Sequence, residues 1–123
     1  MKRALSFLRD AQFWVALAVY AGFALVSTPP SIMEGGNDKT LHFLGNLALY
    51  ASACLRPRPL RRPLLTWGLL LAFSSGVELA QALVPERFPD WRDLLANAGG
   101  LTLGLAGALM LQKKGFPRKK PTG

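Results

Sequence analysis

Four long apolar runs, separated by short segments rich in charge and proline, most constrain what this chain can fold into. The runs cover about residues 11–27, 40–55, 64–84 and 94–112 of the 123 residues. A helix of roughly 20 apolar residues crosses a bilayer, and about 17 is the lower limit. Because apolar residues are gathered in runs instead of alternating with polar ones, we expect one all-α membrane domain, residues 1–123, forming a four-helix bundle.

The positive charges predict how these helices are oriented. Twelve of the 15 Lys and Arg residues lie before the first run, between the second and third runs, or after the fourth. The alternate segments carry five of the acidic residues and only the other three Lys and Arg residues. Because Lys and Arg are enriched in cytoplasmic loops, both termini are expected to be cytoplasmic. The first run also has the basic start of a signal peptide, but no clear cleavage site follows it, so a retained span is favoured.

The same topology explains most of the net charge. A charge of +8 and a pI near 10.4 would suggest a nucleic-acid partner in a soluble protein. Here most of the excess positive charge lies in the segments predicted to be cytoplasmic, where membrane proteins are enriched in Lys and Arg. No nucleic-acid partner is therefore expected. Membrane lipids are the expected partners, with the basic tail, residues 113–120, resting on anionic headgroups.

The opposite, outer ends of the predicted helices collect ionisable residues. Six of the 7 acidic residues and the only histidine can be placed at or near these ends. Such groups are costly close to hydrocarbon, so they are candidates for function unless packing or capping explains them. On the second helix one arc of about 80° contains Lys39, His42, Asn46 and Tyr50. On the third, an arc of about 120° contains Ser74, Ser75, Glu78 and Gln81.

Glu78 is the hardest of these residues to explain structurally. It lies about 10 Å below the outer end of its helix, and ionisation there should cost less than the roughly 2.5–3.5 kcal/mol expected at the centre of a span. The carboxyl group is either protonated or ionised and paired with one of three cations, which the sequence leaves open. Those cations are His42, Lys39 and Arg87.

The fourth helix combines a polar outer end with a small-residue face. Within an arc of about 80° lie Asp93, Asn97, Gly100, Gly104 and Gly107. A small-xxx-small ridge, on which another helix can pack closely, is formed by Ala96, Gly100, Gly104 and Ala108. This face is therefore predicted to be turned toward the bundle.

These polar residues occur in an order that resembles the VanZ-like family of bacterial membrane proteins. The matching series is Asp38-Lys39-x-x-His42-Phe43, Glu78-x-x-Gln81 and Arg87-x-x-Asp90-x-x-Asp93-x-x-x-Asn97-x-x-Gly100, within residues 38–107. The resemblance implies a multi-pass protein of the bacterial cytoplasmic (inner) membrane, in a family that has a member linked to teicoplanin resistance. One departure is Asn46, where the family often has an aromatic ring.

Structural readings remain open beside the functional ones. Asp90 can act as the N-cap of the fourth helix with Asp93 as its capping-box partner, and Asp38 can cap the second helix. His42 can serve only as an interhelical hydrogen-bond donor. Polar packing residues are the plainer interpretation of Asn97 and Gln81.

Three functional hypotheses fit these residues. The first is a non-enzymatic outer pocket that binds a lipid headgroup, a cell-wall precursor or a glycopeptide and affects teicoplanin susceptibility. The second is a small intramembrane enzyme with Glu78 or His42 as acid or base, although no nucleophile motif is present. The third is an accessory subunit that works as a homo-oligomer or with a membrane partner. The expected pocket comprises Asp38, Lys39, His42, Glu78, Gln81, Arg87, Asp90, Asp93 and Asn97.

The sequence predicts no cofactor and assigns no metal ligands. One histidine among several carboxylates would suit an oxygen-preferring ion such as Mg²⁺ or Ca²⁺ better than zinc.

Overall fold

A computed structural model describes residues 1–25, 37–57, 62–85 and 90–113, without the side chains of residues 37 and 38. Within these ranges the chain forms four helices and no strand, so the all-α prediction is confirmed. The helices are α1 (Lys2–Ala24), α2 (Asn37–Cys54), α3 (Pro63–Gln81) and α4 (Trp91–Lys113).

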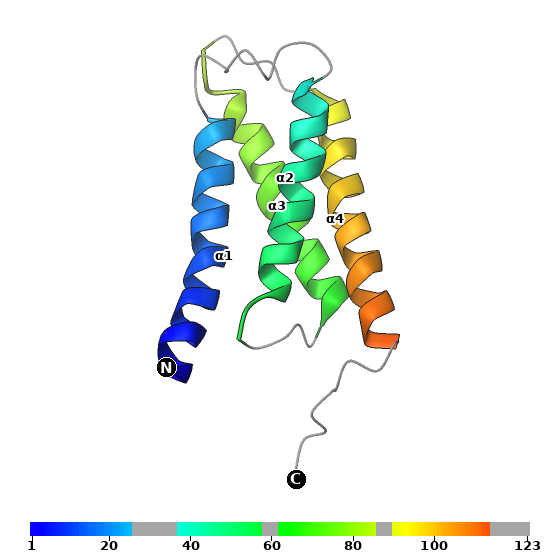
Figure 1. Ribbon diagram of the computed structural model, residues 1–123. Helices are drawn as coiled ribbons and strands as arrows, with labels where there is room; N and C mark the ends of the chain where they lie inside the picture. Colours follow the sequence, from blue (N-terminus) through cyan, green and yellow to red (C-terminus); the bar gives the residue numbers. More distant parts are fainter. Residues whose placement is uncertain (26–36, 58–61, 86–89, 114–123) are drawn as a thin grey trace.

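Consecutive helices run in opposite directions, up and down the bundle (Figure 1). The start of α1, the end of α2, the start of α3 and the end of α4 lie together at the bottom of the view, where the described Lys and Arg residues are most frequent. We call this the basic end. The opposite end, where α2 and α4 begin and α3 finishes, carries Glu78, Asp90 and Asp93, and we call it the acidic end.

The helices begin and end where local chemistry permits, not where the apolar runs do. α1 starts at Lys2, well before its apolar run, because Lys, Arg and Leu are good helix formers. α3 starts with Pro63 at its first position, where proline has no hydrogen bond to lose. α4 carries Lys113 in its last described turn, where a positive charge is favourable.

The most extensive helix contact joins α2 to α4, and glycine makes it possible. A Cβ on Gly100 would overlap the backbone carbonyl of Phe43, and one on Gly104 would lie 2.7 Å from Cβ of Tyr50. Ala108, one turn further along the same ridge, packs against the core. α4 thus presents its small residues to α2, and this contact fixes how the polar side chains of the two helices face each other.

The outer surface of the bundle is strongly apolar. By length and composition α3 and α4 could each cross a membrane, and only 17% of the apolar window of each is buried inside the bundle. A core helix of a soluble protein would be mostly buried. The exposed side chains of these two helices include Leu64, Leu65, Leu69, Leu79, Trp91, Leu95, Leu103, Met110 and Leu111.

Candidate functional site

Three buried ionisable side chains from three helices meet at the acidic end. The Nε2 atom of His42 on α2 lies 3.7 Å from a carboxylate oxygen of Asp93 on α4 and 4.0 Å from one of Glu78 on α3. All three side chains are more than nine-tenths buried. His42 and Asp93 are 51 positions apart in the sequence, with Glu78 between them, yet the three side chains form one compact group. Such a group can exchange a proton or surround a cation.

The other ring nitrogen of His42 is held by a buried amide network. Nδ1 lies 3.1 Å from Oδ1 of Asn97, which also accepts a hydrogen bond from Nδ2 of Asn46 at 2.8 Å. The hydroxyl of Tyr20 on α1 donates to the same oxygen at 3.1 Å. Asn46 and Asn97 are completely buried. Three helices thus fix the position of the imidazole ring.

Lys39 connects this group to the start of α4. Its ammonium lies 3.1 Å from Oδ2 of Asp90 and 3.4 Å from Oδ1 of Asp93. The other oxygen of Asp90 accepts the backbone N–H of Arg92 at 2.9 Å, as an N-cap does. That N–H, together with the Lys39 ammonium, holds the pKa of the Asp90 carboxyl below its ordinary value. Asp90 therefore caps the helix and binds Lys39 as well.

The remaining residues predicted for the pocket have different placements. Gln81 is buried, but its amide donates to the backbone carbonyl of Ala24 at 2.6 Å and so ties α3 to the end of α1. This contact agrees with the polar-packing interpretation of Gln81. Asp38 lies in the first turn of α2, with its side chain outside the description, and Arg87 lies outside the described residues.

Tyr20 is the member of the network that the sequence analysis missed. Its ring packs 3.0 Å from the position that a Cβ would take on Gly45, and its hydroxyl accepts a hydrogen bond from Asn46 at 3.0 Å. Asn46 is the departure from the family pattern seen in the sequence, and here its amide lies beside the Tyr20 phenol. The hydroxyl of Tyr20, within an otherwise apolar stretch of α1, was the available signal.

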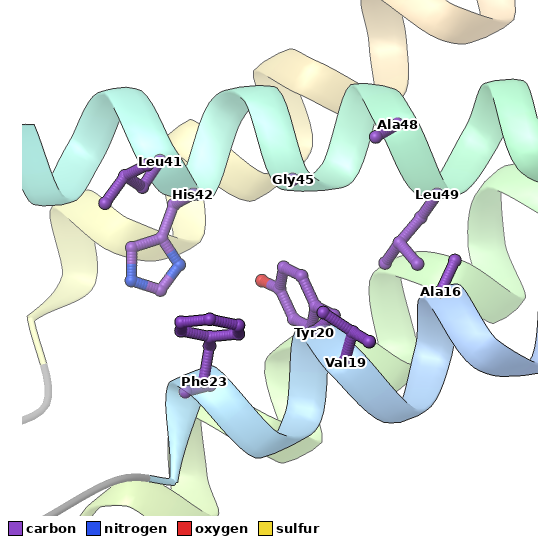
Figure 2. A pocket seen from close by; sticks show the side chains of 10 residues that line it. Ala16, Val19, Tyr20, Phe23, Leu41, His42, Gly45, Ala48 and Leu49 are labelled. Atoms are coloured by element: carbon purple, nitrogen blue, oxygen red, sulfur yellow. The ribbon is translucent and has the colours of Figure 1, made fainter.

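An apolar pocket of about 390 Å³ borders the site between α1 and α2. In Figure 2 the imidazole of His42 and the ring of Phe23 lie at one end of this pocket, and Leu49 and Ala16 lie at the other. The lining is otherwise aliphatic or aromatic, with the residues Val19, Tyr20, Ala24, Leu41, Gly45 and Ala48. A hydrophobic space therefore leads directly to a histidine of the buried polar group.

Fold and site together define a small all-helical protein with a buried polar centre near one end, and two of its helices could cross a membrane. The VanZ/LLP1 family model matches residues 5–112, which include all four helices almost completely. The chain therefore belongs to the VanZ/LLP1 family. Comparisons with curated proteins and with solved structures produced no match.

Proposed function

We propose that this protein spans the bacterial cytoplasmic membrane several times and binds an amphiphilic envelope molecule at its acidic end. The observation that carries the proposal is the apolar pocket between α1 and α2, which is bordered by His42 of the buried polar group. An acyl chain in the pocket would place an attached polar head beside His42 and Lys39. The pocket volume of about 390 Å³ falls in the range of roughly 300–1,000 Å³ that is usual for ligand sites.

The charge distribution supports an extracytoplasmic position for this site. Most of the described positive charges lie in helix ends that come together at the basic end. They are Lys2, Arg3, Arg9, Arg56 and Lys113. Lys and Arg are enriched on the cytoplasmic side of membrane helices, so the acidic end would face outward, and both termini would be cytoplasmic. Large exposed apolar side chains on α1 and α2 support membrane contact by these helices too, and they include Trp14, Val15, Val19, Phe23 and Leu44.

Family membership supports an effect on the cell envelope. The VanZ-like family includes a member linked to teicoplanin resistance, and teicoplanin is a glycopeptide with a lipid tail. A lipid-tailed glycopeptide and a lipid-linked cell-wall precursor share the chemistry that the pocket would select, an apolar chain joined to a polar head. We therefore propose that binding such a molecule changes teicoplanin susceptibility.

Filling the pocket tests this proposal. Ala48 lines the pocket on α2, whereas Ala106 is an exposed alanine on α4. At equal membrane levels in a sensitive host, the wild type and Ala106→Phe should raise the inhibitory concentration of teicoplanin, and Ala48→Phe should not. A glycopeptide without a lipid tail serves as the comparison drug. Equal protection by Ala48→Phe and the wild type would refute a role for the pocket.

Photochemical labelling tests binding directly. A phospholipid with a diazirine in its acyl chain should label peptides from residues 16–24 and 41–49 of the wild type in membranes. Labelling of these peptides should fall in Ala48→Phe and persist in Ala106→Phe. Uniform labelling of all four helices in both variants would show ordinary lipid contact and no selective pocket.

Catalysis is the second candidate, and one observation favours it. His42 lies within 4.0 Å of two buried carboxylates, an arrangement that could move a proton on a bound substrate. Ser74, the buried hydroxyl on α3, donates to the carbonyl of Leu71 at 3.3 Å and so is engaged with its own helix. Turnover of a phosphorylated lipid by the purified protein, abolished in His42→Ala, would establish an enzyme. Binding without turnover would favour the first proposal.

A further inference from the structure

We propose that His42, Glu78 and Asp93 bind a single divalent transition cation of the Zn²⁺ or Mn²⁺ type. Each residue offers one ligand atom, and the three atoms all lie within 4.8 Å of one another. They come from three different helices, α2, α3 and α4, and all three side chains are buried. A cation at this point would join the helices at the acidic end.

The hydrogen bonds of Asn46 determine which nitrogen of His42 carries the proton in the neutral ring. Nδ2 of Asn46 donates to the backbone carbonyl of His42 at 2.8 Å, and this carbonyl can only accept. The same Nδ2 faces Oδ1 of Asn97, so the atom of Asn97 that meets His42 is an oxygen. Nδ1 of His42 must then donate its proton to that oxygen. In the neutral ring, Nε2 consequently presents a lone pair toward Glu78 and Asp93.

This arrangement is the one that metal-binding histidines use. A ligating imidazole usually donates its second ring N–H to a fixed acceptor, which sets the tautomer and increases its basicity. Here the acceptor is Oδ1 of Asn97, which Tyr20 and Asn46 hold in position with hydrogen bonds of 3.1 and 2.8 Å. The supporting shell is thus already built from three helices.

Glu78 supplies a second, independent observation. Its side chain is 3% exposed, and its Oε2 atom is directed at His42 at 4.0 Å. Within the described residues its other oxygen, Oε1, is buried and has no hydrogen-bond partner. A buried carboxylate oxygen without a partner is costly, and a bound cation or its water would satisfy it.

The spacing and charge of the group fit one divalent ion. Ligand atoms about 2.1 Å from a tetrahedral ion are about 3.4 Å from each other, close to the 3.7 and 4.0 Å from His42 to the carboxylates. Lys39 binds Asp90 and Asp93, and Arg92 also acts on Asp90, but no described Lys or Arg forms an ion pair with Glu78. The negative charge that remains would attract a cation. The sequence, with several carboxylates in view, favoured Mg²⁺ or Ca²⁺. The structure brings only two carboxylates to the imidazole, and a site with one nitrogen ligand among three ligands suits Zn²⁺ or Mn²⁺ better.

The single histidine makes the test unambiguous. Tag-free full-length protein, labelled with ¹⁵N-histidine, is placed in lipid nanodiscs, treated with chelator and titrated with ZnCl₂ or MnCl₂. With diamagnetic Zn²⁺, NMR should first show one protonated and one unprotonated ring nitrogen. The unprotonated signal should then shift and saturate at one equivalent of Zn²⁺. An imidazolium with both nitrogens protonated, unchanged by millimolar Zn²⁺, would overturn the proposal.

Variants identify the carboxylate ligands by calorimetric titration. Glu78→Gln and Asp93→Asn should each weaken Zn²⁺ binding at least about ten-fold, the lower limit reported for losing even a supporting residue. Asp10→Asn, at the basic end, is the matched control and should bind like the wild type. Circular dichroism checks that each variant keeps its helices. Unchanged affinity in folded Glu78→Gln, or a preference for Mg²⁺ over Zn²⁺, would contradict the assignment.

This inference does not depend on amphiphile binding. The titrations use no glycopeptide and no photoreactive lipid, and filling the pocket by Ala48→Phe leaves all three ligand residues unchanged. Zn²⁺ binding that survives in Ala48→Phe, together with lost lipid labelling, would separate the two proposals.

Discussion

The two ends of the bundle both join helices through polar side chains, but they do so in opposite ways. At the basic end Arg56 and Asp10 form an ion pair at 2.7 Å, with 36% and 42% of their side chains exposed. At the acidic end His42 lies 3.7 and 4.0 Å from carboxylates, and the three side chains are only 3–7% exposed. The exposed pair is short, whereas the buried group is spaced more widely than direct hydrogen bonds require.

The difference indicates different roles. At the basic end, Arg9 also donates to the carbonyl of Leu55, and Gln12 donates to that of Ser52, so side chains satisfy backbone groups near the end of α2. These contacts are complete and need no ligand. At the acidic end a buried oxygen of Glu78 has no partner among the described residues. A buried polar atom without a hydrogen-bond partner calls for an explanation, such as a catalytic role or a bound ion or water.

The largest loss of stability should come from disturbing the close contact between Gly100 on α4 and Phe43 on α2, near the acidic end. In Gly100→Ala the new Cβ would meet the backbone carbonyl of Phe43, which cannot move aside as a side chain can. We expect a loss of about 3 kcal/mol in the free energy of unfolding, the upper part of the range for overpacking. Circular dichroism during denaturant titration in micelles measures it.

Gly107 provides the matched control on the same helix. A Cβ there would meet nothing within 4 Å, so Gly107→Ala should be neutral or stabilise by up to about 1 kcal/mol through helix propensity. Equal losses in both variants would show that the α2–α4 contact at Phe43 is not tight.

A smaller effect is expected from removing the acceptor shared by the buried network. Asn97→Leu takes away the oxygen that Tyr20, His42 and Asn46 contact. Interhelical hydrogen bonds in membranes average about 0.6 kcal/mol each, so we expect a loss of roughly 1–2 kcal/mol. The same unfolding titration applies. Thr102→Val removes a single interhelical hydrogen bond, from Trp67 to an exposed hydroxyl on α4. It should cost less than half as much and serves as the comparison.

The next effect tests whether Tyr20 belongs to the acidic-end network. Tyr20→Phe removes the hydroxyl that bridges Asn46 and Asn97 and should cost about 0.6 kcal/mol. In a double-mutant cycle this cost should shrink in the Asn97→Leu background, because the partner is already gone. Tyr50→Phe, whose hydroxyl donates to the Pro63 carbonyl, should be additive with Asn97→Leu. Additivity for Tyr20 would place it outside the network.

The smallest effect should come from the ion pair at the basic end. Asp10→Asn removes the carboxylate that binds Arg56, but both groups are well exposed, so we expect a loss of about 0.5 kcal/mol or less. The difference from wild type should vanish in 1 M NaCl, where the screening length is about 3 Å. A loss larger than that of Asn97→Leu would reverse the comparison between the two ends.

Much of the architecture was predictable because it depends on local pattern. Apolar runs bounded by proline and charge predicted all four helices, and alternation of basic and acidic segments predicted which ends lie together. The runs did not predict helix ends, since α1 begins at Lys2 and α3 stops at Gln81. An apolar run marks the surface that avoids water, whereas helix ends depend on capping and turn chemistry.

The candidate site was only partly predictable. Periodicity placed His42, Glu78 and Asp93 on inward faces at one end of the bundle, and they do converge. It could not show that Gln81 would instead bind the Ala24 carbonyl, or that Tyr20 would join the network from α1. These partners are 57 and 77 residues apart in the chain, and no local spacing relates them.

By itself the sequence determined the helices, their alternating directions and the sign of charge at each end, because these follow from hydropathy, helical periodicity and loop charge. The tertiary structure decided which side chains meet. The fit of Gly100 and Gly104 against α2 fixes the rotation and height of α4, and so it sets the distance from Asp93 to His42. Side-chain contacts between helices depend on such offsets to within an ångström or so, and only close packing of the whole bundle specifies them.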